Sequence, residues 1–440
     1  MRSSFLRLKP PAHPIDAEIT LPGSKSYTNR ALIIASLADG KSTLHATSQS
    51  DDSRFLIEGL RKLGVRIEEA GDTLTIHGTG GQLTPYKGDI DVGPAGTTMR
   101  FLTALCCVVE GCEVRLHGSE RMHKRPIGAL VDALKTLGAD ITYEGTPGHP
   151  PLRIRGHKDG WGTKASMQGH ISSQFFTALL LIAPQLPNGL QLQVEGQQIS
   201  PSYIDMTCEM MEHFDVSVTH EDYRCYHVTP HATYTPTTLH IEGDASGASY
   251  FWGLAACSGG RIRVHNASPT SLQGDIQFAH ILEKMGCTYR TGVHQGVPWI
   301  EVKGPTSCQG VEVDMSSMPD TAQSLAVIAS CAKGKTHITG LSTLKHKETD
   351  RLVALHQELE KLGIHSTITE ESITIEGGTP HKARIDTYED HRMAMSFAIL
   401  GAHLEGIEIN EPHVVTKSFP DFWQVLQSTG IHVERTGVDT

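Results

Sequence analysis

The chain alternates between long runs of small and aliphatic residues and shorter stretches in which apolar and polar positions alternate. Six runs share one layout: each opens with polar or small residues, continues as an apolar stretch of helical length and ends at a glycine. They cover residues 26–40, 95–111, 171–189, 245–260, 320–334 and 390–406. Their starts lie 69, 76, 74, 75 and 70 residues apart, which indicates an internal repeat. Because these helices are apolar on nearly all sides, we expect them to be buried.

A second pattern follows each run. After the glycine comes a β-branched or alternating stretch, such as EVRL at 113–116, which predicts a strand. An amphipathic helix comes next, in which Ile127, Leu130 and Leu134 recur at intervals of three and four and Gly138 is placed to end the helix. The same helix is expected at 55–64, 276–286, 352–363 and 422–430, and a copy near 203–215 lacks the glycine. Further alternating stretches complete a unit of order βαβαββ.

The repeat decides the architecture. A chain of 440 residues exceeds what one hydrophobic core usually supports. We therefore predict a mixed α/β (α+β) fold of two domains, each built from three βαβαββ units around buried helices. Residues 24–243 are expected to form one domain, and residues 1–23 together with 244–440 the other, so that the N-terminal strand joins the later half.

Composition and charge indicate which binding partners and which cellular location to expect. The formal net charge of −11 argues against nonspecific binding to nucleic acid or anionic membranes. The longest apolar runs, such as ALLLIA at 178–183, fall far short of the roughly 20 residues that cross a bilayer. Residues 1–15 lack a continuous apolar core and contain three prolines, which is atypical of a secretory signal. We expect a cytoplasmic protein.

Cysteine and histidine give no metal signature at this level. The nine cysteines include no Cys-x-x-Cys pair, and the 25 histidines form no His-Glu-x-x-His motif. An odd number of cysteines in a cytosolic chain is typical of reduced thiols. The sequence therefore predicts neither a disulfide framework nor a metal site.

Cations recur at the predicted helix starts. A helix N-terminus carries a partial positive charge, so a lysine or arginine there costs roughly 0.3–1 kcal/mol. The residues concerned are Lys25, Arg30, Lys347, Arg351, Arg392 and Lys417. Lys347 and Arg351 are also expected four residues apart on one helical face, where like charges repel. Any one of them could be a solvated surface cation, but together they predict a site for phosphate or carboxylate groups.

These cations lie within a set of short motifs that spans the chain. They are LPGSKSYTNR at 21–30, AGTTMR at 95–100, RMHKRPIG at 121–128, SSQ at 172–174, GDAS at 243–246, KETDR at 347–351, DHRMAM at 390–395 and KSFPD at 417–421. The set resembles the motifs of the enolpyruvyl transferase family, and the motifs stand in the order found in that family. Within the family, the set is most similar to the branch that acts on shikimate 3-phosphate.

The resemblance implies a reaction and its reactants. Two domains of three units each would close around shikimate 3-phosphate and phosphoenolpyruvate, with the active site in the interdomain cleft. The enolpyruvyl group would pass to the 5-hydroxyl of shikimate 3-phosphate with release of phosphate, a step of aromatic amino-acid biosynthesis. The resemblance implies no metal or organic cofactor, a monomer, and inhibition by the phosphonate glyphosate at the phosphoenolpyruvate site.

Site residues carry over by motif. Those implied for shikimate 3-phosphate are Lys25, Ser26, Arg30, Ser172, Ser173, Gln174, Ser200, Tyr203, Asp320, Thr343 and Lys347. Those implied for phosphoenolpyruvate are Lys25, Gly96, Arg125, Gln174, Arg351, Arg392 and Lys417. Gly96 suits a close approach of ligand to backbone, because a Cβ would occupy that space.

Two carboxylates are the implied proton-transfer groups. The resemblance makes Asp320 the base for the 5-hydroxyl and Glu348 the acid for the methylene carbon, with Lys25 assisting. Asp320 could also be the N-cap of the helix that it opens. For Glu348 the alternative is a capping box, which is weakened because Lys345 rather than Ser or Thr stands three residues before it.

Three positions depart from the family pattern. Pro94 and Thr343 stand where asparagine is common, and Phe101 stands where proline is common. The shape around Gly96 and the Thr343 contact are therefore open at this point.

Other readings are weaker. The UDP-N-acetylglucosamine branch has Gly-Ser-Lys-Asn where this chain has GSKS at 23–26, and its reactive cysteine loop is missing here. A noncatalytic phosphometabolite-binding protein would need the cations but not Asp320 and Glu348. A P-loop kinase is disfavoured because no Gly-x-x-x-x-Gly-Lys-Ser/Thr segment occurs.

Overall fold

The computed structural model describes residues 5–436. Within them, each of the six apolar runs forms a helix that is buried almost along its whole length, as predicted. These helices are α1 (Lys25–Leu37), α3 (Gly96–Cys107), α5 (Ser173–Ile182), α7 (Ala245–Ser258), α9 (Ala322–Ser330) and α11 (His391–Phe397). Short 3₁₀ turns extend three of them: η2 (Ala183–Gln185), η4 (Pro319–Thr321) and η6 (Ala398–Ala402). Since these helices expose almost no polar face, they can only be stable inside the core.

The amphipathic helices pack outside them. They are α2 (Asp51–Lys62), α4 (Gly128–Thr136), α6 (Ser202–Glu212), α8 (Phe278–Lys284), α10 (Arg351–Lys361) and α12 (Phe422–Ser428), with η3 (Gly274–Gln277) leading into α8. In α4, Leu130, Val131 and Leu134 are buried, which is the face that the sequence periodicity predicts. The copy without a glycine, α6, leaves through Asp215, which adopts a left-handed φ of 63°. Aspartate tolerates this conformation better than most residues, so the turn survives without glycine.

Within residues 5–436, six four-stranded sheets cover the helices. In spatial order they are β14 (Thr238–His240), β3 (Lys41–His45), β5 (Thr73–His77), β4 (Arg66–Ala70); β6 (Lys87–Asp91), β7 (Glu113–His117), β9 (Leu152–Arg155), β8 (Asp140–Tyr143); β10 (Lys164–Gln168), β11 (Leu190–Glu195), β13 (Cys225–Val228), β12 (Thr219–His220); β2 (Asp16–Thr20), β15 (Arg261–His265), β17 (Val297–Lys303), β16 (Thr288–His294); β18 (Glu312–Asp314), β19 (Lys335–Thr339), β21 (Ile373–Glu376), β20 (Ser366–Ile368); and β22 (Arg384–Ile385), β23 (Ile407–Asn410), β1 (Phe5–Lys9), β24 (His432–Thr436). In each sheet the first two strands pair in parallel and the other pairs are antiparallel.

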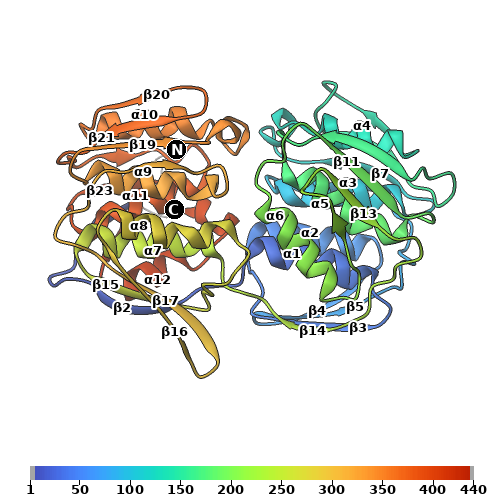
Figure 1. The fold of residues 1–440 in the computed structure, drawn as a ribbon, viewed down its shortest axis with the longest axis horizontal. Coiled ribbons are helices and arrows are strands. Elements are labelled where there is room, and N and C mark those ends of the chain that lie inside the picture. Colours follow the sequence, from blue (N-terminus) through green and yellow to red (C-terminus); the bar gives the residue numbers. More distant parts are fainter. Residues whose placement is uncertain (1–4, 437–440) are drawn as a thin grey trace. The chain divides into compact units, whose positions relative to one another are not determined.

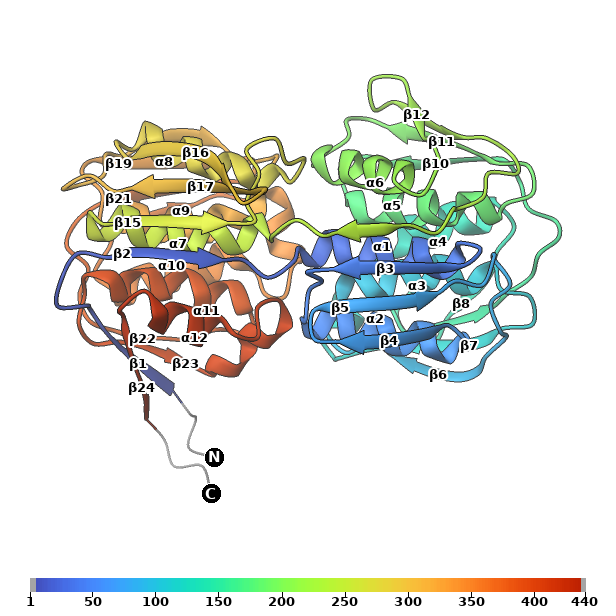
Figure 2. The ribbon, with the colours of Figure 1, turned by 90° about the horizontal axis from the view of Figure 1, so that it is seen from below.

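Three units are continuous in sequence and three borrow a strand. The units built on α3, α5 and α9 run βαβαββ without interruption. In the unit of α1, the parallel edge strand is β14, almost 200 residues further along, and β2 has that role beside β15 in the unit of α7. The last unit is completed by β1, which pairs with both β23 and β24 (Figure 2).

The chain divides into two compact units, which we call the N-half and the C-half. The N-half is Gly23–Ile241, and the C-half contains the described residues up to Pro22 and from Glu242 onwards. Within the N-half, α1, α3 and α5 pack against one another, and within the C-half α7, α9 and α11 with η6 do the same (Figure 1). Among residues 5–436, no helix has the length and hydropathy needed to span a bilayer.

Candidate active site

In the C-half, charged side chains converge where the helices α9, α10 and α11 begin. Asp320 lies in η4, directly before α9, and Asp390 is the N-cap of α11. Arg392 lies in the first turn of α11, and Arg351 is the first residue of α10. Because Asp390 accepts a hydrogen bond from the backbone N–H of Arg392, the helix start itself fixes the position of the carboxylate.

Arg351 is the centre of this cluster, with only 1% of its side chain exposed. Its Nε donates to Asp390 Oδ2 at 2.7 Å, and its Nη1 donates to Asp320 Oδ1 at 3.0 Å. Its Nη2 reaches Glu348 Oε2 at 2.8 Å. Burial opposes the charged form, but the three carboxylates outweigh it and raise the pKa of Arg351 further. A single guanidinium therefore contacts both carboxylates that the family resemblance implies for proton transfer.

Asp320 is held by three cations. Besides Arg351, its oxygens lie 3.1 Å from Lys347 Nζ and 3.0 Å from Arg392 Nη2. Burial alone would raise the pKa of Asp320, yet Arg392, Lys347 and Arg351 together hold that pKa well below its ordinary value. Asp320 is therefore ionised at neutral pH. Its side chain makes no N-cap bond, because the N-cap of α9 is Thr321 and no side chain caps it, so the N-cap interpretation is wrong.

Glu348 and Lys347 precede the helix that was expected to contain them. The 3₁₀ turn η5 (Ser342–His346) ends before Lys347, and α10 begins only at Arg351 with Asp350 as its N-cap. The prediction that Lys347 and Arg351 share a helical face is therefore wrong. The side chain of Asp350 takes the capping role, which leaves Glu348 outside any capping box. Glu348 instead contacts Arg351, and its Oε1 lies 2.7 Å from Lys417 Nζ.

Further polar groups line this cluster, and the sequence did not single out most of them. Arg392 donates to Tyr250 Oη at 3.2 Å and to Ser246 Oγ at 3.3 Å. Ser246 donates in turn to Asp275, a carboxylate that is almost fully buried. Burial and the charge of Asp320 raise the pKa of Asp275 to about 6. GDAS at 243–246 was among the motifs, but Asp275 lies in a 3₁₀ turn with no motif around it.

Thr343, a residue of η5, has a side-chain hydroxyl without a hydrogen-bond partner among the described residues. Its Oγ1 is shielded from solvent and makes no hydrogen bond within residues 5–436. A buried polar atom of this kind normally has a partner, so it is suited to contact a bound molecule.

In the N-half, the helix starts again carry the predicted residues. Lys25 and Ser26 open α1, and Lys25 Nζ pairs with Asp52 Oδ2 at 3.0 Å. Asp52 is buried near the start of α2 and was not predicted. Ser172 is the N-cap of α5 and accepts from the backbone N–H of Gln174, so Ser173 and Gln174 lie in the first turn. These residues present hydroxyl, amide and ammonium donors.

Arg30 lies deeper than the others. Only 2% of the residue is exposed, and its guanidinium donates to Thr207 Oγ1 at 2.9 Å, Thr177 Oγ1 at 3.3 Å and the carbonyl of Tyr203 at 3.0 Å. No carboxylate within the described part of the chain pairs with it, and burial lowers the pKa of Arg30 to about 10. Arg30 therefore remains a cation that ties α1 to α5 and α6 through neutral oxygens.

The loop into α6 has an unusual backbone. Ser200 adopts a left-handed φ of 49°, and Tyr203 follows it in the first turn of α6. The Tyr203 ring lies 5.9 Å from the Arg30 guanidinium carbon, within the range of a cation–π contact. A non-glycine residue in this region is uncommon and marks a position where the surroundings fix the backbone.

Gly96 and Arg125 touch each other. Gly96 is the first residue of α3, and Arg125 follows the 3₁₀ turn η1 (Met122–Lys124). A Cβ built on Gly96 would lie 2.5 Å from Arg125 Nη1 and 2.8 Å from its Cζ. The sequence predicts that glycine leaves room for ligand, but the nearest group that it leaves room for is this guanidinium. Phe101, five residues further along α3, is almost fully buried.

Known proteins resemble this chain over almost its whole length. The sequence model of the family described as EPSP synthase (3-phosphoshikimate 1-carboxyvinyltransferase) matches residues 10–426. The chain is 42% identical to 3-phosphoshikimate 1-carboxyvinyltransferase of Marinomonas sp. (strain MWYL1), over 95% of this chain and 98% of that protein. It is 39% identical to the enzyme of the same name from Methanoculleus marisnigri, over 95% and 98% of the two chains.

Solved structures agree on the fold. EPSP synthase from Acinetobacter baumannii superposes with a TM-score of 0.82 at 25% identity, over 99% of this chain and 100% of that chain. The enolpyruvyl transferase NikO from Streptomyces tendae reaches a TM-score of 0.77 at 14% identity and shares the fold. The chain therefore belongs to the EPSP synthase (3-phosphoshikimate 1-carboxyvinyltransferase) family.

Proposed function

We infer that this protein transfers the enolpyruvyl group of phosphoenolpyruvate to the 5-hydroxyl of shikimate 3-phosphate. The products are 5-enolpyruvylshikimate 3-phosphate and phosphate. Membership of the family supports the reaction. The observation that carries it in this chain is the pair of partly buried carboxylates, Asp320 and Glu348, that share one guanidinium and contact three further cations.

Shikimate 3-phosphate is proposed to bind to residues of both halves: Lys25, Ser26, Arg30, Ser172, Ser173, Gln174, Ser200, Tyr203, Asp320, Thr343 and Lys347. Arg30 supports this site by its charge and by fixing Tyr203, since its own donors already face protein oxygens. The unsatisfied hydroxyl of Thr343 supplies a donor where the family has an amide.

Phosphoenolpyruvate is proposed to bind to Lys25, Gly96, Arg125, Gln174, Arg351, Arg392 and Lys417. The five basic side chains of this set can neutralise the negative charge of its phosphate and carboxylate. Glyphosate, a phosphonate that also carries a carboxylate, is proposed to inhibit at the same residues.

The chemistry follows from proton balance. The oxygen of the 5-hydroxyl bonds to C2 of phosphoenolpyruvate while Asp320 takes the hydroxyl proton and Glu348 gives a proton to C3, which becomes a methyl group. Phosphate then leaves while Glu348, now a carboxylate, takes one proton back from that methyl group, which restores the double bond. We propose that bound phosphates draw Lys347, Arg351 and Arg392 away from Asp320, so that its pKa rises and it becomes a better base. Lys25 would assist proton transfer from the N-half.

Two further expectations belong to this proposal. The cations of the two halves would repel in the free protein, so we propose that bound anions favour closure. Small-angle scattering should then show a smaller radius of gyration with saturating shikimate 3-phosphate, with the change weakened by salt. We also propose that the protein works as a cytoplasmic monomer, which the molar mass from light scattering would test.

One assay tests the reaction. Phosphate release from phosphoenolpyruvate should depend on shikimate 3-phosphate and should not occur with UDP-N-acetylglucosamine. Glu348→Gln should be assayed together with a matched control, Glu360→Gln, which changes a glutamate on the exposed face of α10. Binding of both substrates without phosphate release in the unmodified protein would instead indicate a noncatalytic phosphometabolite-binding protein.

A further inference from the structure

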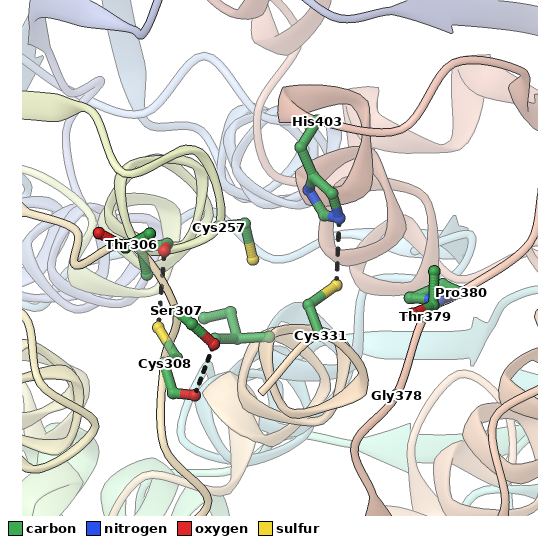
Figure 3. Close-up of a pocket in the computed structure, with 11 residues that line it drawn as sticks. Cys257, Thr306, Ser307, Cys308, Cys331, Gly378, Thr379, Pro380 and His403 are labelled. Atoms are coloured by element: carbon green, nitrogen blue, oxygen red, sulfur yellow. Dashed lines mark hydrogen bonds between the residues drawn. The ribbon is translucent and has the colours of Figure 1, made fainter. Parts of the chain in front are cut away.

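A second cluster lies in the C-half at the opposite ends of the same buried helices. Cys257 lies in the last turn of α7, Cys331 is the C-cap of α9, and His403 is the C-cap of η6, which continues α11. Cys331 Sγ lies 3.3 Å from His403 Nε2 (Figure 3). One ligand atom from each of the three residues falls within 4.8 Å of the others. Packing of α7, α9 and η6 against one another brings these side chains together from positions far apart in sequence.

The spacing suits one particular class of ion. Tetrahedral zinc binds thiolate at about 2.3 Å and imidazole nitrogen at about 2.0–2.1 Å, which places neighbouring donor atoms about 3.3–3.8 Å apart. The observed donors need to move by no more than about 1 Å to reach this geometry. Two thiolates and a neutral imidazole around a divalent cation also give a neutral centre, which a partly buried position favours. Binding would release up to two protons, one from each thiol.

The helix termini add to this preference. A helix C-terminus carries a partial negative charge, so three such ends at one place favour a cation. The N-half provides an internal comparison: the last turns and C-caps of α1 and α5 contain no cysteine or histidine, and α3 has Cys106 and Cys107 in its last turn but Val108 as its C-cap. Among the described residues of the N-half, no three metal-ligand side chains lie together. The chelating set is therefore a feature of the C-half and does not follow from the repeated fold itself.

The cluster is also accessible. Cys257, Cys331 and His403 line a cavity of about 240 Å³ together with Thr306, Ser307 and Cys308. This cavity leaves room for a fourth ligand, such as water. The carboxylate–cation cluster begins at the N-terminal end of α9, so about 14 Å of helix separates the two places.

We propose that Cys257, Cys331 and His403 form a binding site for a zinc-class divalent cation, with its fourth position open to the cavity. This site could not be predicted from the sequence, because the three ligands come from three different repeats and share no short motif. Sites with three protein ligands and one open position are typical of exchangeable or catalytic zinc.

The test uses the full-length protein, reduced and freed of metal, titrated with cobalt as a spectroscopic substitute for zinc. We expect one equivalent of cobalt to bind with a thiolate-to-cobalt charge-transfer band and the visible bands of a tetrahedral centre, and one equivalent of zinc to displace it. Cys331→Ser and His403→Ala should each weaken binding by on the order of 100-fold or more, since even outer-shell substitutions cost 10–100-fold.

Cys208→Ser is the matched control, because Cys208 is a partly exposed free cysteine of the N-half. It should bind cobalt like the unmodified protein, and both variants of the cluster should keep the circular dichroism spectrum of the native fold. Absence of the band in the reduced protein overturns the proposal. A charge-transfer band that survives in both Cys331→Ser and His403→Ala also overturns it. The same holds if Cys257 and Cys331 form a disulfide and the protein binds no cobalt after that disulfide is reduced.

Discussion

Replacing Gly96 by alanine tests how the N-half holds its candidate phosphate-binding arginine. The new Cβ would lie 2.5 Å from Arg125 Nη1, whereas carbon and nitrogen normally approach to about 3.5 Å, so the guanidinium must retreat by about 1 Å. The neighbour is the far end of a flexible side chain, so we expect the free energy of unfolding to change by less than about 1 kcal/mol. Function should suffer more, because a displacement of about 1 Å in a binding group can cost on the order of 100-fold.

The measurement is kcat and KM for phosphoenolpyruvate in a double-mutant cycle of Gly96→Ala and Arg125→Lys. If the methyl group acts through Arg125, the alanine should cost much less in the lysine background than in the native one. We expect KM for phosphoenolpyruvate to rise while KM for shikimate 3-phosphate stays within about two-fold. Additive effects of the two substitutions, or an unchanged KM for phosphoenolpyruvate, would refute the reasoning.

Three other predictions concern the C-half. Asp320→Asn should lower kcat by roughly 10²–10⁴-fold with a smaller effect on substrate binding, and near-native turnover would remove Asp320 from the mechanism. Glu348→Gln cannot donate a carboxyl proton, so incorporation of solvent deuterium at C3 should disappear, whereas the Glu360→Gln control should retain it. Asp275 has a folded-state pKa of about 6, above that of an unfolded carboxyl, so the native state binds more protons between pH 4 and 6. Stability should therefore fall as pH rises through that window, by up to about 3 kcal/mol, and Asp275→Asn should flatten the urea-derived profile there.

The repeat made most of the fold predictable. A helix that is buried on all sides requires a long apolar run, and the tight turn after it requires a residue with left-handed φ. Both features can therefore be recognised in a short stretch of sequence. The borrowed strands are different. Nothing in the three residues of β14 indicates that they pair with β3, because that pairing depends on where the whole N-half brings its two ends.

The candidate site was predictable in its cations but not in its partners. Helix starts with lysine or arginine stand out because they violate a local electrostatic rule. Asp52 and Asp275 break no such rule, and their contacts with Lys25 and Ser246 arise only through tertiary packing. The prediction that Lys347 opens a helix was wrong for a local reason. Asp350 is the better N-cap, so α10 begins at Arg351, four residues after Lys347.

Phe101 is the last departure from the family pattern with a testable consequence. It is almost fully buried in α3, so it can act on a ligand only by shifting the start of the helix at Gly96. Phe101→Pro removes a helical N–H donor and a large side chain, which should cost about 3 kcal/mol or more, so assays belong well below the melting temperature.

Proline, the residue that is common at this position in the family, would reshape the first turn of α3. We expect glyphosate inhibition to tighten more than KM for phosphoenolpyruvate falls, because the bulkier ligand is more sensitive to the position of Gly96 and Thr97. Phe101→Leu is the control, since it also removes volume but keeps the backbone N–H. The ratio of the inhibition constant to KM should therefore fall in the proline variant and stay constant in the leucine variant, and equal ratios in both would show that backbone geometry at Phe101 does not set glyphosate sensitivity.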